Sequence, residues 1–255
     1  MRLFTFGCSF TNFHWPTWAD IIAHDLQCEY QNWAVSAIGN VAIQHKLLEC
    51  DLKHKFTDDD LVLVVWSGWS REDRYFGEWV KGGNIFSLPD KNKEWIENYW
   101  HIENDIVKNM SAIISANRNH SITHQSHIFD YNFYLNEKEK EHNKEIQNTL
   151  QKFDYLIDAM PEKHVFSREN NSQFLGTTWD EHPDILCHLE YANFIYSKLG
   201  MTMKQSTIDY YNRMFYDIVE KFKKEKRKTK ISDWIVLEKV MTKIVKEWYD
   251  EQSNI

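Results

Sequence analysis

Residues 3–12 read Leu-Phe-Thr-Phe-Gly-Cys-Ser-Phe-Thr-Asn, a short apolar run that passes directly into a turn of small residues. An apolar run of this length, with aromatic residues and Thr, is typical of a buried strand. Pro16 and Trp18 then begin a helix. A strand that turns straight into a helix places the turn at the carboxyl edge of a sheet, where ligands bind in open α/β folds. We therefore expect the Ser9 hydroxyl at that edge, facing a crevice.

The same alternation of strand and helix continues after this turn. Apolar periodicity and turn residues predict a helix over 16–26, a strand over 29–34, a helix over 41–52 and a strand over 61–66. The last of these strands is apolar on both faces, as expected at the centre of a parallel sheet. The pattern predicts a three-layer α/β/α fold around a central parallel sheet, with right-handed crossovers.

The rest of the chain is predicted to be largely helical. Residues 75–100 lack a clear period and are interpreted as a loop or lid. The elements expected beyond it are a helix over 93–116, a strand over 124–133, a helix over 137–160, a strand over 163–166, a polar loop over 167–181 and a helix over 183–199 closed by Gly200. Residues 201–255 differ in composition and predict two amphipathic helices. We therefore divide the chain into an α/β domain over 1–200 and a helical C-terminal extension over 201–255.

Composition and charge limit the classes of partner and the cellular settings that we expect for this chain. A net charge of −8 argues against nucleic acid as a partner. No signal peptide and no apolar run long enough to span a membrane is visible, which predicts no membrane association. Cys8, Cys28, Cys50 and Cys187 lack CxxC spacing, which suits free thiols in a reducing compartment. We expect a cytoplasmic protein, with a virion or another setting left open.

Four short segments have the residue types that nucleophilic catalysis needs. Each follows a predicted strand or precedes a late helix: Ser9, Gly39-Asn40, Ser67-Gly68-Trp69-Ser70-Arg71 and Asp180-Glu181-His182-Pro183. Because the carboxyl ends of parallel strands meet at one edge, segments that are far apart in sequence can converge there.

Together these segments resemble the SGNH/GDSL hydrolase superfamily over roughly residues 2–200. Gly7-Cys8-Ser9-Phe10 is similar to the family's first block, with Cys8 where Asp is usual, and Gly39 is similar to the second block. Asp180 and His182, followed by Pro183, resemble the last block, although one residue separates them instead of two. Ser70 stands where the third block has Asn. Loss of one oxyanion donor typically lowers turnover by ~10²–10³.

The resemblance implies a flavodoxin-like sheet topology and a serine esterase without metal or organic cofactor. Ser9 is the implied nucleophile, His182 or His188 the base, and Asp180 the group that orients the base. The oxyanion site would be formed by Ser9, Gly39 and Ser70, while Asn40 and Arg71 would bind substrate. Asn40 or Arg71 could also take the place of the missing Asn instead of Ser70, and without a substitute the site would be weak or inactive. The implied substrate is a small-molecule or glycan ester, such as an O-acetyl group on a carbohydrate.

Other interpretations of the same residues stay open. Ser9 and Gly39 also suit tight turns, Asp180 suits a helix N-cap, and Cys8 is either an inert buried thiol or a rival nucleophile. The missing Asn favours a degenerate binding or structural protein of the same fold. An O-acyltransferase would use the same machinery but exclude water from the acyl-enzyme.

Three further groups of residues are interpreted without a catalytic role. His120, His124 and His127 have a spacing compatible with a metal, but no cluster of carboxylates or Cys accompanies them, so we expect no metal site. The basic run over 221–230 is interpreted as a solvated helix face, with weak support for an anionic partner. The Trp-containing last helix suggests core packing or a homo-oligomer contact.

Overall fold

The computed structural model describes residues 1–80, 89–128, 144, 182–226, 239–240, 242–247 and 250. The chain forms two compact units. Unit 1 comprises Met1–Thr11 and Glu29–Pro161, and unit 2 comprises Asn12–Cys28 and Glu162–Ile255. The sheet belongs to unit 1, and unit 2 is built from helices.

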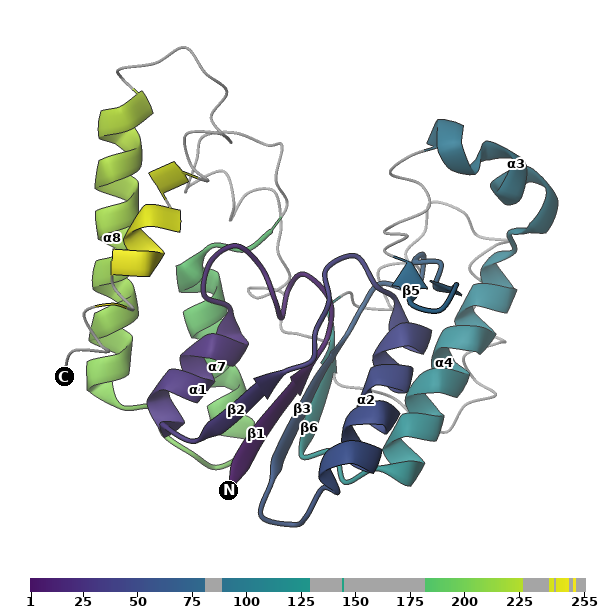
Figure 1. The fold of residues 1–255 in the computed structure, drawn as a ribbon, viewed down its shortest axis with the longest axis horizontal. Helices are drawn as coiled ribbons and strands as arrows, with labels where there is room; N and C mark the ends of the chain where they lie inside the picture. Colours follow the sequence, from purple (N-terminus) through teal and green to yellow (C-terminus); the bar gives the residue numbers. More distant parts are fainter. Residues whose placement is uncertain are drawn as a thin grey trace. The chain divides into compact units, whose positions relative to one another are not determined.

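Unit 1 contains a four-stranded parallel sheet in the order β2-β1-β3-β6 (Figure 1). Its strands are β1 (Arg2–Phe6), β2 (Glu29–Asn32), β3 (Leu61–Trp66) and β6 (His124–His127). This confirms the predicted α/β class with a parallel sheet. The chain leaves β1 toward one edge to form β2 and then returns past β1 to form β3. The strand order therefore reverses between β1 and β3, which is where ligands bind in open α/β sheets.

Two helices lie side by side against one face of this sheet, α2 (Asn40–His54) and α4 (Ile102–Asn119) (Figure 1). Alternate residues of β1 and β3 point toward them because side chains alternate along a strand. The resulting core contains Phe4, Phe6, Val62, Val64 and Trp66 from the strands and Ile43, Leu47, Met110 and Ile113 from the helices. Leu3 of β1 is buried as well, and so are Leu63 and Val65 of β3. The strand at 61–66 is therefore buried on both faces, as predicted.

Unit 2 is organised around α1 (Trp18–Leu26), α7 (Ile185–Lys198) and α8 (Gln205–Lys226), which pack against one another. The Asp25 carboxylate of α1 accepts hydrogen bonds from the Tyr196 hydroxyl at 2.8 Å and from the Lys204 N–H at 3.0 Å. One buried carboxylate thus connects α1 to α7 and to Lys204, the residue before α8. Gly200 has a φ of 67°, the left-handed conformation that ends α7 where the sequence predicts.

The structure differs from the sequence prediction in three places. The helix expected over 93–116 is two helices, α3 (Pro89–Tyr99) and α4, because His101 is extended and the indole N–H of Trp100 donates to Asp105 at 2.7 Å. The hairpin of β4 (Arg74–Tyr75) and β5 (Trp79–Val80) was not predicted. The strand β6 ends at His127, earlier than expected.

Several predicted elements lie outside the described residues. They are the helix over 137–160 apart from Lys144, the strand over 163–166, and the whole loop over 167–181, which includes the catalytic candidate Asp180. Within the part of the chain that the structure describes, no helix combines the length and apolar character that a bilayer span requires.

An ion pair ties the first strand to the start of the third. The Arg2 guanidinium donates to both carboxylate oxygens of Asp60 at 2.9 and 2.6 Å, and the N–H of Thr57 donates to the same carboxylate at 2.9 Å. Asp60 is buried, and these hydrogen bonds lower its pKa. A carboxylate stabilised in this way contributes folding stability above its unfolded pKa and loses it as the pH falls through the folded pKa.

We predict that Asp60→Asn lowers the midpoint of urea unfolding at pH 7. The difference from wild type should shrink as the pH falls below about 4, because Asp60 of the unfolded chain then binds a proton that the folded protein, with its lowered pKa, binds only at lower pH. The exposed neighbour Asp59 provides the control, and Asp59→Asn should change the midpoint little at either pH. A difference that stays constant from pH 7 to pH 2.5 would contradict the role of this ion pair.

Candidate active site

Ser9 lies in a tight turn immediately after β1. The N–H of Thr11 donates to the Cys8 carbonyl at 2.9 Å, so Ser9 occupies the second position of the turn. Ser9 is 5% exposed. Gly7 has no room for a side chain, since an added Cβ would collide with Thr11 and lie 3.0 Å from the Val65 carbonyl oxygen. The small residues of this block therefore let the turn pack closely against the end of β3.

Asn40, the first residue of α2, is fully buried and joins this helix to the end of β3. Its Oδ1 accepts from the Ser67 N–H at 2.7 Å, and its Nδ2 donates to the Ser67 carbonyl at 3.0 Å. The other Nδ2 hydrogen is donated to Oδ1 of Asn109 at 2.7 Å. Both amide hydrogens are used inside the protein, so Asn40 positions the loop after β3. A direct contact between Asn40 and substrate stays a prediction that this geometry does not favour.

Asn109 on α4 continues the same network. Its Nδ2 donates to the Trp69 carbonyl at 3.1 Å and to the Asp105 carbonyl at 2.7 Å. Two buried amides therefore determine the path of residues 67–69. Ser70, the next residue in this loop, is 8% exposed, and its role as an oxyanion donor stays a prediction.

Gly39, the expected oxyanion donor at the start of α2, is in contact with a carboxylate. Its N–H donates to Oδ1 of Asp73 at 2.6 Å, and the N–H of Ala42 donates to Oδ2 at 3.0 Å. A Cβ on Gly39 would lie 2.7 Å from Oδ2 of Asp73 and 3.0 Å from the Cβ of Arg71. Glycine is therefore needed here because the loop over 71–73 packs directly on the backbone.

Arg71 takes part in this packing through its guanidinium, which donates from Nη1 to the Ile38 carbonyl at 3.3 Å. Burial raises the pKa of Asp73, while its two backbone hydrogen bonds and the nearby Lys108 act in the opposite direction. The sequence analysis missed Asp73. The available signal was that Gly39 begins a helix without a side chain that could cap it, so the first amides of α2 need an acceptor from elsewhere.

In unit 2, His182 lies just before α7 and stacks on Phe13, with ring centroids 3.9 Å apart. The indole N–H of Trp15 donates to the Pro183 carbonyl at 2.8 Å, which holds the same segment. The N-cap of α7 is Asp184, which accepts from the Cys187 N–H at 2.9 Å. Asp180, the other N-cap candidate and the proposed orienting carboxylate, lies outside the described residues.

His188 lies inside α7 and is fully buried. Burial, with a smaller effect of the neighbouring His182, lowers the pKa of His188 to about 3. An imidazole in this environment is a weak base. Of the two histidines that the sequence left open, His188 is therefore poorly suited to accept a proton.

The structure thus brings together one part of the expected site. Gly39, Asn40, Ser70 and Arg71 belong to unit 1 with Ser9, whereas His182 and His188 belong to unit 2. The pairing of Ser9 with a histidine and with Asp180 stays a prediction.

The other candidate groups do not form a catalytic site among the described residues. No group of three or more His, Cys, Asp or Glu side chains is arranged to hold a metal in the described ranges. His120, one of the three histidines with a metal-compatible spacing, places its Nδ1 2.6 Å from a carboxylate oxygen of Asp51.

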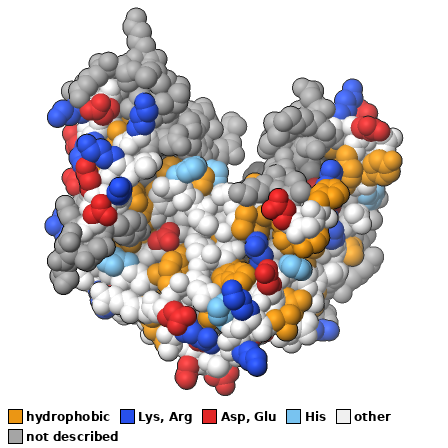
Figure 2. Space-filling model, viewed as in Figure 1, with side chains coloured by type: hydrophobic (Ala, Val, Ile, Leu, Met, Phe, Trp, Pro, Cys, Tyr) orange, Lys and Arg blue, Asp and Glu red, His pale blue; other side chains and the backbone are white. Residues whose placement is uncertain are grey.

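The rings of Tyr75 and Phe76 in the hairpin are exposed, and Figure 2 shows hydrophobic side chains gathered over this part of unit 1.

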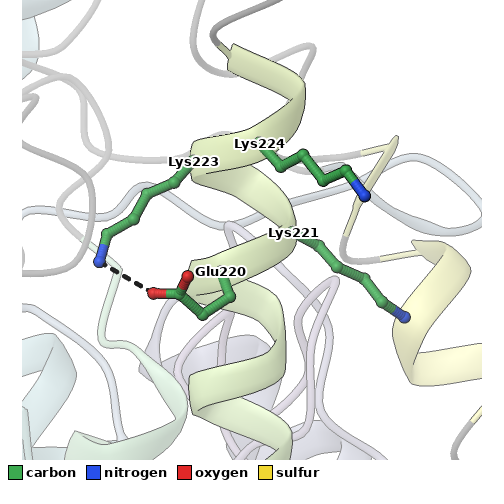
Figure 3. Close-up of a pocket in the computed structure, with 4 residues that line it drawn as sticks. All are labelled: Glu220, Lys221, Lys223 and Lys224. Atoms are coloured by element: carbon green, nitrogen blue, oxygen red, sulfur yellow. Dashed lines mark hydrogen bonds and ion pairs between the residues drawn. The ribbon is translucent and has the colours of Figure 1, made fainter.

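A pocket on α8 is lined by Glu220, Lys221, Lys223 and Lys224 (Figure 3). Lys223 pairs with Glu220 at 3.2 Å, and Lys221 pairs with Glu247 at 3.0 Å. These are exposed ion pairs on a helix surface, which contribute little energy and need no ligand. An anionic partner for the basic run stays a prediction.

No family model matches the chain, and a search of curated proteins found no match.

We predict that Asn40→Ala lowers the free energy of unfolding by about 3 kcal/mol, because it leaves buried groups of Ser67 and Asn109 without partners. Urea denaturation of the purified variant measures this loss. Asn98→Ala on the exposed surface of α3 is the matched control and should cost less than about 0.5 kcal/mol. Equal losses in the two variants would show that the Asn40 amide does not hold the loop.

Proposed function

We propose that the protein is a serine esterase that cleaves a carboxylic ester, with Ser9 as the nucleophile. The observation that supports this most is the position of Ser9 in the sheet. Its turn follows β1, the loop over 67–73 follows β3, and these adjacent strands flank the point where the strand order reverses. We assign the chain to the three-layer SGNH/GDSL-like class, with a helical extension over 201–255.

In the proposed reaction, the Ser9 hydroxyl oxygen attacks the ester carbonyl carbon while His182 takes the hydroxyl proton. The carbonyl oxygen becomes an oxyanion that backbone N–H groups of Ser9 and Gly39 would stabilise. The proton then passes from His182 to the leaving alcohol, and a covalent acyl-Ser9 ester forms. Water, deprotonated by the same imidazole, cleaves this ester and restores the Ser9 hydroxyl. Asp180 would orient the imidazole. No metal or organic cofactor is required for these steps.

A small-molecule or glycan ester, such as a carbohydrate O-acetyl group, is the proposed substrate class. The exposed rings of Tyr75 and Phe76 support a glycan, because they follow the loop over 67–73 in the chain and present apolar faces to solvent.

The second candidate function is a binding protein that has lost turnover. It is favoured by the contact between the Gly39 N–H and Asp73, together with Ser70 in the place of an oxyanion Asn. Each of these features removes a donor that the esterase would use in its transition state.

Hydrolysis of p-nitrophenyl acetate separates the two functions. We expect wild type to hydrolyse it above the buffer rate and Ser9→Ala to lose at least about a hundredfold in kcat, because the variant lacks the hydroxyl that forms the acyl intermediate in this proposal. Ser197→Ala, which removes an exposed hydroxyl on α7, should keep the wild-type rate. Equal rates in wild type and Ser9→Ala would support the binding protein.

The pH dependence of kcat/KM identifies the base, which must be neutral to accept a proton. His188, with a pKa of about 3, would stay neutral and active down to about pH 4. We expect instead that activity does not persist to pH 4 and that His182→Ala is as inactive as Ser9→Ala. Activity that persists to pH 4, with His182→Ala still active, would assign the role to another group.

A further inference from the structure

The loop over 71–73 places a charged group on the expected oxyanion donor. Asp73 Oδ1 lies 2.6 Å from the Gly39 nitrogen, and Oδ2 lies 3.0 Å from the Ala42 nitrogen. An oxyanion donor must lie about 2.7–3.1 Å from the substrate oxygen. A single N–H cannot serve two anions well, so a substrate oxyanion can use Gly39 only after the Asp73 carboxylate has moved away.

We propose that Asp73 is an autoinhibitory group that occupies the oxyanion site at rest and is displaced when substrate binds. This inference rests on the proposed function and adds a regulatory contact to the same site. It also accounts for a Gly39 N–H that is already hydrogen-bonded to a carboxylate in a chain that has the Ser9 block.

The charges around Asp73 support a contact that can be exchanged. Lys108 of α4 faces this loop, but its ammonium pairs with Glu72 at 2.8 Å and with Asp105 at 3.5 Å. Glu72, the adjacent residue, adds a like charge that opposes ionisation of Asp73. Asp73 is therefore held mainly by backbone amides, and another anion can replace it at the same amides.

A purely structural role for Asp73 makes a different prediction. A carboxylate at a helix start satisfies orphan N–H groups and stabilises the helix. If capping of α2 is its only role, removal of Asp73 lowers stability and leaves the esterase rate unchanged or reduced. If Asp73 also blocks the donor, removal lowers stability but raises the rate.

The test compares Asp73→Ala and Asp73→Asn with wild type in Ser9-dependent hydrolysis of p-nitrophenyl acetate. We expect Asp73→Ala to raise kcat/KM about tenfold, which is the order of one charge-assisted hydrogen bond. Asp73→Asn should give a smaller rise, because its amide oxygen still accepts from Gly39 but carries no charge. Glu72→Gln is the matched control, since it removes a carboxylate from the same loop without freeing the Gly39 N–H, and it should not raise the rate.

Thermal unfolding of each variant by circular dichroism shows which variants are folded. If Asp73→Ala does not fold, the hydrolysis rate of Asp73→Asn decides the test. The double variant Asp73→Ala/Ser9→Ala should be inactive, which shows that the gain passes through Ser9. If wild type shows Ser9-dependent hydrolysis and neither folded Asp73 variant is faster than wild type, only the autoinhibitory role is overturned. If wild type and both Asp73 variants all lack Ser9-dependent hydrolysis, the proposed esterase is wrong and this inference falls with it.

Discussion

The side-chain amide of Asn40 is the contact on which the described site depends. It connects the first turn of α2 to the end of β3 through Ser67 and to α4 through Asn109, with three hydrogen bonds of 2.7–3.0 Å. All of these groups are buried, so each would be costly to leave unpaired. The amide therefore determines where the loop after β3 runs, and that loop in turn carries Ser70, Arg71 and Asp73 past the start of the helix.

The turn after β1 and the loop after β3 follow neighbouring strands at the switch point of the sheet. Gly7 allows the turn after β1 to lie close to β3, and Gly39 allows the loop over 71–73 to lie directly on the start of α2. Neither glycine has a positive φ, so close packing is the reason for each. The same closeness gives Asp73 access to the Gly39 N–H, so the proposed oxyanion donor is hydrogen-bonded to a carboxylate of its own chain.

Local patterns in the sequence were sufficient to predict the sheet. The apolar runs before Ser9 and at 61–66 predict buried neighbouring strands, and alternation with helices implies that they are parallel. Gly200 predicts the end of α7 because a glycine that follows an apolar helical pattern commonly ends the helix. The break between α3 and α4 was missed because no Pro or Gly marks a boundary at His101, whose backbone is extended.

The contacts that define the site were harder to predict because they join distant residues. Asp73 caps a helix that begins far earlier in the chain, and nothing in its local sequence distinguishes it from an exposed loop carboxylate. Asn40 was interpreted as a substrate ligand because its type and position suit that role, whereas its burial follows from the packing of α2 on α4. Burial likewise argues against His188, which the sequence offered as a second candidate beside His182.

Covalent trapping with a fluorophosphonate tests the role of Ser9 most directly, because this reagent phosphorylates a serine only where a base activates it. After labelling of the folded protein, proteolysis and tandem mass spectrometry locate the modified residue. The account predicts one adduct, on Ser9, that is absent after heat denaturation. A protein that stays unlabelled, or an adduct on another residue, would contradict it.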